Sequence, residues 1–180
     1  SATTVTASPK VSVHGTKVLV EGKVTDVSPG TKSAALSMRF PNGVPAVADE
    51  SMSDWMLYVY KQFPCPANVK GVEVIIEVLD PNNNYYEVAR ATSDGSGFYS
   101  ATFTPPVPGK YTIIARFAGS KSYWGSHAET AIVVEEAPVA PEVTPTPASM
   151  TETYVLGFGI AMLVAIIVIG LLIILMLRKR

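Results

Sequence analysis

Apolar and polar residues alternate with a period of two through much of the segment 11–135. In the clearest run, residues 72–79, valine or isoleucine occupies every second position. Successive side chains of a β-strand point to opposite faces, so such a run predicts a strand with one face in a core. Turn sequences rich in Pro, Asn, Asp and Gly separate the runs by about 8–14 residues. The pattern therefore predicts a mainly β protein, with an antiparallel β-sandwich over residues 11–135.

The segment 50–63 has a helical period instead. Its large apolar residues recur at spacings of three and four, which places them along one side of a helix; they are Met52, Trp55, Met56, Val59 and Phe63. Ser51 followed by Asp54 resembles a capping box, and Pro64 ends the helix. We expect one inserted helix that packs over one end of the sheets. A membrane-surface or partner-binding helix is the alternative, which the single exposed cation, Lys61, disfavours.

Two other stretches lack a clear period. Residues 1–10 are small and rich in Thr and Ser, which predicts an N-terminal linker or a loose first strand. Residues 31–49 contain several turn signals. Within them, Leu36, Met38 and Phe40 are the candidates for a short strand.

Residues 154–177 are 24 consecutive uncharged residues, and Arg178, Lys179 and Arg180 follow directly. As a helix this segment is about 36 Å long, enough to cross a hydrocarbon core of about 30 Å. Basic flanks stay in the cytoplasm, so residues 178–180 form a cytoplasmic tail and the N-terminal domain is extracellular. We therefore predict a single transmembrane helix in the cell membrane. The alternative, an apolar core helix of a soluble protein, rarely reaches this length.

Residues 136–153 join the predicted domain to the predicted membrane helix. They contain four prolines, at Pro138, Pro141, Pro145 and Pro147. This composition predicts a semi-extended stalk, at about 3.1 Å per residue, rather than a packed segment. The topology also requires export, so we expect that Ser1 follows either processing or an upstream segment.

Charge and cysteine usage narrow the classes of function. The net charge is −1, and residues 1–153 carry 11 basic and 15 acidic side chains, or −4. This excludes the basic surface of a nucleic-acid-binding protein. There is one cysteine, Cys65, so no intrachain disulfide is possible and the core must hold the domain. We expect its thiol to be buried or inert.

Candidate chemistry is sparse. His14 and His127 are far apart in the sequence without nearby metal-ligand partners, and neither a G-x-S-x-G nor a phosphate-loop motif occurs. We therefore expect a non-enzymatic protein without a cofactor. Calcium is a weak candidate, because side-chain oxygens occur in two hairpin turns, at Asp80, Asn82, Asn84 and Asp94. Turn formation explains these residue types equally well and is the favoured interpretation.

Aromatic residues suggest one binding surface. Tyr123 and Trp124, together with Tyr85 and Tyr86, are candidates for a platform that binds a sugar or a protein. Such side chains more often fill a sandwich core, which is the alternative for at least two of the four.

Small residues suggest a second contact, within the apolar segment. Gly157, Ala161 and Ala165 are spaced by four, and such a stripe lets a second helix approach closely. Gly and Ala are also common in membrane helices without any partner, so the stripe alone decides nothing.

The segments 91–99, 109–112 and 117–123 place glycines at turns and aromatic residues at inward strand positions. They resemble the D-x-x-G-x-F/Y, P-x-x-G-x-Y and F-x-G-x-x-x-Y signatures of bacterial and archaeal immunoglobulin-like (Ig-like) modules of surface proteins. The run from 49–56 through 71–74, with the stalk and the anchor, resembles the C-terminal region of archaeal membrane-anchored proteins. In those proteins an extracellular PQQ-binding-like β-propeller precedes an Ig-like domain. This chain contains no propeller repeats, so the resemblance implies an Ig-like sandwich on a membrane anchor and no catalytic residue.

Three hypotheses for function follow. The first is a surface protein that displays an Ig-like domain for envelope architecture, adhesion or anchoring of a larger extracellular module. Its partners would be membrane lipid and proteins at the cell surface or in the bilayer, and not nucleic acid. The second is an accessory single-helix subunit of a membrane enzyme complex. The third is a glycan- or calcium-binding surface module.

Overall fold

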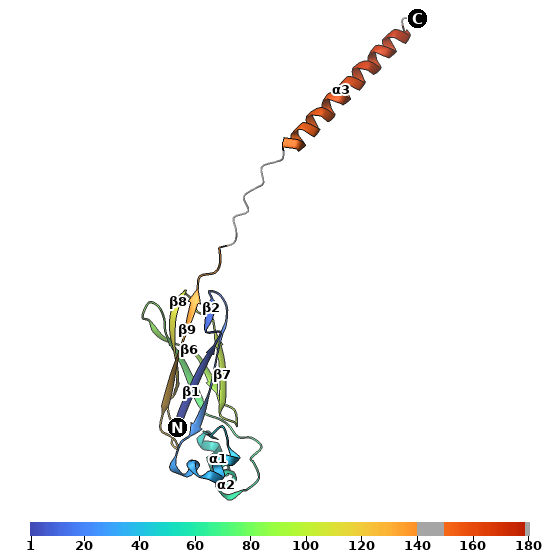
Figure 1. Ribbon diagram of the computed structural model, residues 1–180. Coiled ribbons are helices and arrows are strands. Elements are labelled where there is room, and N and C mark those ends of the chain that lie inside the picture. Colours follow the sequence, from blue (N-terminus) through green and yellow to red (C-terminus); the bar gives the residue numbers. More distant parts are fainter. Residues whose placement is uncertain (140–149, 179–180) are drawn as a thin grey trace. The chain divides into compact units, whose positions relative to one another are not determined.

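Two β-sheets pack face to face in the N-terminal part of the chain (Figure 1). The computed structural model describes residues 1–139 and 150–178, which belong to two units divided after Pro138. The first unit contains both sheets and two short α-helices, and the second contains a single long helix. The prediction of a mainly β protein with one apolar C-terminal helix is confirmed.

The first sheet is built around β3, which pairs with β1 on one side and with β7 and β4 on the other. All of these pairings are antiparallel. The bounds are β1 (Ala2–Ser8), β3 (Val18–Asp26), β4 (Val44–Pro45) and β7 (Phe98–Phe103). Residues 2–8 are therefore a fully paired strand, and the domain begins well before residue 11. Of the two alternatives for residues 1–10, a linker or a first strand, the structure contains the strand.

The second sheet has the order β2-β9-β8-β5-β6, and every pairing except the parallel β2–β9 pair is antiparallel. The bounds are β2 (Val11–Val13), β5 (Glu73–Leu79), β6 (Tyr85–Thr92), β8 (Gly109–Phe117) and β9 (Ser126–Glu135). The chain crosses from the first sheet to the second between Ser8 and Val11, so both sheets share its N-terminal segment.

The core lies between the sheets, as the alternation predicts. Val74, Ile76 and Val78 are completely buried on the inner face of β5, against residues of the other sheet. Burying each such side chain stabilises the fold by about 1.5–3 kcal/mol. Tyr111 is also buried, and its hydroxyl donates to the carbonyl of Val107 at 2.8 Å, so its polar atom is satisfied.

A helical insert, residues 27–72, connects β3 to β5. It contains two 3-10 turns, Pro29–Lys32 and Asp49–Ser51, and two α-helices, α1 (Ala34–Arg39) and α2 (Met52–Lys61). It has a small core of its own, formed by Leu36, Val44, Val47, Trp55 and Val59. Met52 packs against this core and against the sandwich core, which joins the two.

Helix α1 replaces the short strand that we expected around Leu36, Met38 and Phe40. The Ser33 side chain accepts from the Leu36 amide at 3.4 Å and caps the helix. Leu36 and Phe40 are four residues apart, so they lie on one side of the helix and pack into the insert core, whereas Met38 is 84% exposed. Spacing by two suggests a strand, but only Leu36 and Phe40, four residues apart, face the core, and that spacing fits a helix.

Helix α2 confirms the predicted inserted helix, with two differences. Ser51 forms no capping hydrogen bond, because its hydroxyl accepts from the Lys70 amide at 3.1 Å instead. The helix ends at Lys61, where Gln62 takes a left-handed conformation (φ 59°), so Phe63 lies outside the helix and is exposed. Trp55 and Val59 form the buried side.

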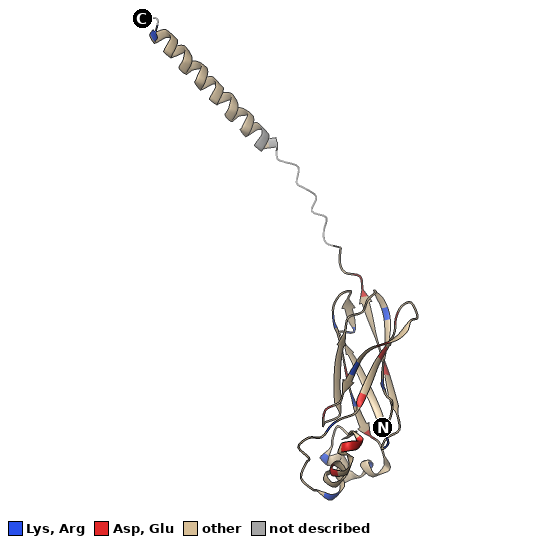
Figure 2. Cartoon of the chain, turned by 180° about the vertical axis from the view of Figure 1, so that it is seen from behind, with Lys and Arg blue, Asp and Glu red and all other residues tan. Residues whose placement is uncertain are grey.

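The second unit contains α3 (Met150–Arg178), whose stretch Tyr154–Arg178 is long and apolar enough to span a membrane. Its large apolar side chains are all at least half exposed within this unit. Lys, Arg, Asp and Glu do not occur between residues 154 and 177, and Arg178 follows (Figure 2). The part of the predicted stalk at residues 140–149, with three of its four prolines, and tail residues Lys179 and Arg180 lie outside the described residues.

Candidate functional site

The two ends of the sandwich differ. The helical insert, the β6–β7 turn and the β8–β9 loop meet at one end, which we call the helical end (Figure 1). Ser1 also lies there, since its hydroxyl donates to the carbonyl of Trp124 at 2.6 Å. The β5–β6 turn and the last residue of β9, Glu135, lie at the opposite end, where the chain leaves the sandwich.

A pocket of about 510 Å³ opens at the helical end, and we call it the aromatic pocket. Its wall combines the loop from α1 to β4, one side of α2, the segment after α2, and the β6–β7 turn. The lining residues are Arg39, Phe40, Pro41, Asn42, Gly43, Pro45, Trp55, Tyr58, Cys65, Pro66, Ala67, Val69, Gly95, Ser96 and Phe98. Its volume lies within the range of about 300–1,000 Å³ that is usual for small-molecule sites.

Three aromatic rings of the insert contribute to this wall. The centroids of Phe40 and Tyr58 are 6.0 Å apart in an edge-to-face arrangement, and those of Trp55 and Tyr58 are 5.3 Å apart. Trp55 is only 3% exposed, and its Nε1–H has no hydrogen-bond partner among the residues that the structure describes. A buried donor without a partner costs about 1–3 kcal/mol, so this indole leaves an unsatisfied N–H inside the insert.

Arg39 holds α1 to the end of α2. Its Nη1 donates to the carbonyl of Tyr58 at 2.9 Å and to that of Val59 at 3.1 Å, carbonyls in the last turn of α2. Its guanidinium also lies over the Tyr58 ring, 4.2 Å from the centroid. Nε and Nη2 of Arg39 have no protein acceptor within the described part of the chain. The guanidinium is thus fixed in place and still has donors to offer.

Asp49 fastens the insert to the β8–β9 loop. Its carboxylate accepts from the Ser120 hydroxyl at 3.1 Å, from the Lys121 amide at 3.0 Å and from the Ser122 amide at 3.1 Å. Hydrogen bonding to Ser122 and then to Lys121 lowers the pKa of Asp49. The three hydrogen bonds engage one hydroxyl and two backbone amides of the loop with a carboxylate of the insert. They connect positions about 70 residues apart in the sequence.

A second fastening joins the end of the insert to the β6–β7 turn. The amide of Val72 donates to the Ser93 hydroxyl at 2.9 Å, and the amide of Ser93 donates to the carbonyl of Val72 at 2.9 Å. Gly71 lies directly against Ser93, because a Cβ at this position would be 1.9 Å from the Ser93 carbonyl oxygen. This close approach holds the end of the insert against the β6–β7 turn.

The calcium candidates do not come together. Asp80 lies in the β5–β6 turn and Asp94 in the β6–β7 turn, so the full length of β6 separates them. Oδ1 of Asp80 accepts from the amides of Asn82 and Asn84, and its Oδ2 accepts from the Asn84 side chain, which lowers the pKa of Asp80. Oδ1 of Asp94 likewise accepts from two amides of its own turn. These oxygens stabilise turns, and the part of the chain that the structure describes has no group of three or more His, Cys, Asp or Glu side chains placed to hold a metal ion.

The aromatic platform is not assembled either. Tyr123 is buried in the sandwich core at 8% exposure, whereas its neighbour Trp124 is 90% exposed. Tyr85 and Tyr86 begin β6 at the opposite end of the sandwich. Trp124 is therefore exposed at the helical end without the other three rings of the predicted platform beside it.

The small residues of α3 do share one side of the helix. Gly157, Ala161 and Ala165 line a shallow hollow with Tyr154, Phe158 and Met162. A Cβ added at Gly157 would meet nothing within 4 Å. The hollow is therefore open within the described unit, as a stripe for helix packing requires.

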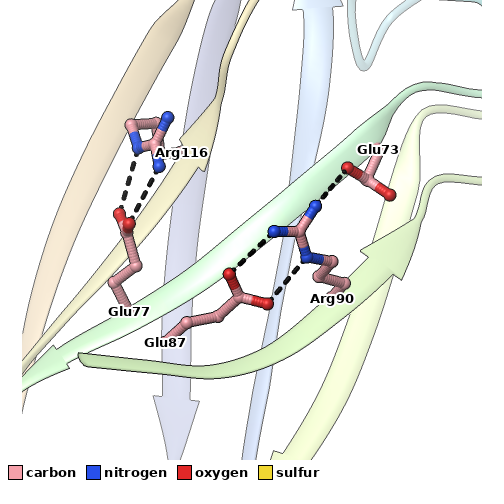
Figure 3. A network of polar contacts seen from close by, with 5 residues as sticks. All are labelled: Glu73, Glu77, Glu87, Arg90 and Arg116. Carbon is pink, nitrogen blue, oxygen red and sulfur yellow. Dashed lines mark hydrogen bonds and ion pairs between the residues drawn. The ribbon is translucent and has the colours of Figure 1, made fainter.

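Ion pairs cover the outer face of the second sheet, on β5, β6 and β8 (Figure 3). Glu77 is only 7% exposed, and Arg116 binds both of its oxygens, at 2.8 and 3.0 Å. Arg116 lowers the pKa of Glu77. Arg90 bridges Glu73 and Glu87 beside this pair. Sequence alternation identifies the outward positions, but it does not show which charges meet across the strands.

The aromatic pocket is the site that sequence reasoning missed. The stripe on α2 identified Trp55 as a core residue, and the structure adds Tyr58, Arg39 and Cys65 around it. Cys65 is exposed rather than buried. No protein-family model matches the chain, and a search of curated proteins finds no match.

Proposed function

We propose that this chain is a non-enzymatic, single-pass membrane protein that displays a β-sandwich at the cell surface. The surface of α3 is the observation that carries the proposal. Sixteen of the residues from 154 to 177 are Leu, Ile, Val or Phe, and their side chains are exposed within their own unit. Transfer of these sixteen into a bilayer is favourable by roughly 5–10 kcal/mol.

Charge supports the orientation. Arg178, Lys179 and Arg180 follow the apolar stretch directly, and such basic clusters remain on the cytoplasmic side. The sandwich then lies outside the cell. The proline-rich composition of residues 138–147 supports a role for this segment as a spacer between domain and membrane.

The strand arrangement supports an Ig-like domain in particular. Its N-terminal segment is shared between the two sheets, and β5, β8 and β9 form the centre of the second sheet. The helical end lies opposite the point where the chain leaves the sandwich. We propose that this end is the contact surface for envelope partners, whether in adhesion or in holding a larger module.

Cys65 provides a direct test, because it is the only cysteine and is exposed. On intact cells a membrane-impermeant maleimide should label wild-type Cys65 without permeabilisation. In the matched control, Cys65→Ser combined with Arg180→Cys, labelling should appear only after the membrane is opened. Labelling in the reverse order, or a chain that stays monodisperse in buffer without detergent or lipid, would refute the proposal.

An accessory subunit of a membrane complex is the second candidate. The hollow at Gly157, Ala161 and Ala165 favours it, because a partner helix can approach closely there. Gly157→Leu fills the hollow, whereas Gly159→Leu on the same helix is the control. Under this hypothesis mild-detergent purification recovers a stoichiometric multi-span partner, which Gly157→Leu loses and Gly159→Leu retains. Recovery of the lone wild-type chain excludes it.

A further inference from the structure

The aromatic pocket contains polar groups that the fold does not use. The Trp55 indole N–H is buried without a partner, and Nε and Nη2 of Arg39 have no protein acceptor among the residues described. The remaining nitrogen, Nη1, is engaged with the two carbonyls of α2, so the guanidinium cannot swing away without breaking that contact. Arg39 therefore presents unused donors at the pocket wall, whereas the Trp55 N–H lies unsatisfied behind the wall.

The charges around the pocket favour an acceptor group that is negatively charged. Asp and Glu are missing from the residues that line the pocket within the described part of the chain, while Arg39 is one of them. A second cation, Lys23, lies over the Phe98 ring at the pocket edge, 4.4 Å from its centroid. An acidic residue, Asp94, directly precedes the lining residue Gly95 in the sequence. Its Oδ1 accepts from the amides of Ser96 and Phe98. Arg39 is the one charged side chain among the described residues that line the pocket, so a negative group there meets a cation.

The wall also contains flat apolar surfaces. The rings of Phe40, Tyr58 and Phe98 lie in it, together with prolines from two loops. Such surfaces contact a ring or a branched hydrocarbon well, and they offer little to an extended polar chain. The volume of about 510 Å³ accommodates one group of this size with its charge.

We infer that the aromatic pocket binds a monoanionic ligand that carries a carboxylate on an apolar, ring-sized body. Arg39 receives the carboxylate, and the rings receive the body. This site is separate from membrane anchoring, so its failure leaves the proposed function standing. The same chemistry occurs in free organic acids and at the C-terminus of a protein chain that ends in an apolar residue.

Cys65 and Trp55 both line the pocket and serve as built-in reporters. The full chain is placed in lipid nanodiscs and exposed to three probes that share one body: 4-tert-butylbenzoate, the neutral 4-tert-butylbenzamide and the cationic 4-tert-butylbenzylamine. The benzoate should slow alkylation of Cys65 by iodoacetamide severalfold, and the amide should bind at least about tenfold more weakly. The amine should give no protection. In a Trp124→Phe background Trp55 is the only tryptophan, and its fluorescence should change with the same affinity.

Variants separate the pocket from the membrane and from the fold. Ala67 is an exposed pocket residue, so Ala67→Phe should fill the site and abolish benzoate protection. Ala131→Phe, at an exposed position of β9, should leave protection intact. Equal protection by all three probes, no protection at millimolar benzoate, or full protection in Ala67→Phe would each overturn the inference.

A peptide arm distinguishes the two sources of the carboxylate. A pentapeptide that ends in Phe is compared with its C-terminal amide. If the free acid of the peptide binds more tightly than 4-tert-butylbenzoate and the amide does not bind, a chain terminus is the ligand. If benzoate binds and neither peptide does, the ligand is a free acid. Binding by both peptides alike counts against carboxylate recognition.

Discussion

Gly71→Ala should loosen the insert, and the structure allows the effect to be estimated. The new Cβ would lie 1.9 Å from the Ser93 carbonyl oxygen and 2.5 Å from its carbonyl carbon, which are backbone atoms that cannot rotate away. Relief requires a backbone shift of about an ångström, and overpacking of this kind typically costs about 1–3 kcal/mol. The shift also breaks one or both hydrogen bonds between Val72 and Ser93, at about 0.5–1.5 kcal/mol each. We expect a total loss of about 1.5–6 kcal/mol.

The assay is thermal unfolding followed by near-ultraviolet circular dichroism, with the full chain in detergent. For a domain of this size the expected loss lowers Tm by roughly 6–20 °C. Gly95→Ala is the matched control, because its Cβ would meet Val69 at an ordinary 3.7 Å. That variant should be neutral or stabilised by about 0.4–1 kcal/mol. If Gly71→Ala unfolds within 2 °C of wild type, the close approach of insert and turn is not what holds them.

Three further predictions concern single side chains. The folded-state pKa of Glu77 lies below its usual 4.5, so its pairing stabilises the fold above that pH and is lost as the pH falls through the lowered value. Glu77→Gln should therefore cost about 1–2 kcal/mol in urea unfolding at pH 7, and this cost should shrink as the pH falls below 4.5; a cost that stays the same at every pH would contradict the ion pair. Asp49→Asn should speed hydrogen exchange at the Lys121 and Ser122 amides, whereas the control Asp54→Asn on exposed α2 surface should not. Tyr123→Ala should cost about 3–5 kcal/mol, because this ring fills the core, and Trp124→Ala less than about 0.5 kcal/mol; similar costs would show the two rings are misplaced.

The sequence predicts those elements in which large apolar residues occupy the buried face and polar residues occupy the exposed face. Strand β5 has one face against the core, so its buried residues Val74, Ile76 and Val78 alternate with other residues, and this alternation predicts the strand. The strand β1 obeys the same period through Thr3, Val5 and Ala7, which point inward. Small and polar residues give this alternation little hydrophobic contrast, so the stretch resembled a linker.

The separation of the calcium candidates was open to prediction. Asp80 and Asp94 lie in consecutive hairpin turns, and consecutive turns are joined by one strand. The eight residues of β6 extend about 26 Å, so the two carboxylates belong to opposite ends of the sandwich. The same rule separates Tyr85 from Trp124.

The aromatic pocket could not be predicted from sequence patterns, because its walls come from segments that meet only through long-range contacts. The α2 stripe predicts that Trp55 is buried, but not that Arg39 reaches the last turn of the same helix. That contact depends on where the loop after α1 runs, and the loop in turn is fixed by Val44 and Val47 in the insert core. Since Met52 packs against both cores and Asp49 binds the β8–β9 loop, the sandwich dictates where α2 lies. The pocket is therefore a property of how the insert docks, and it exists only while the insert stays attached to the sandwich.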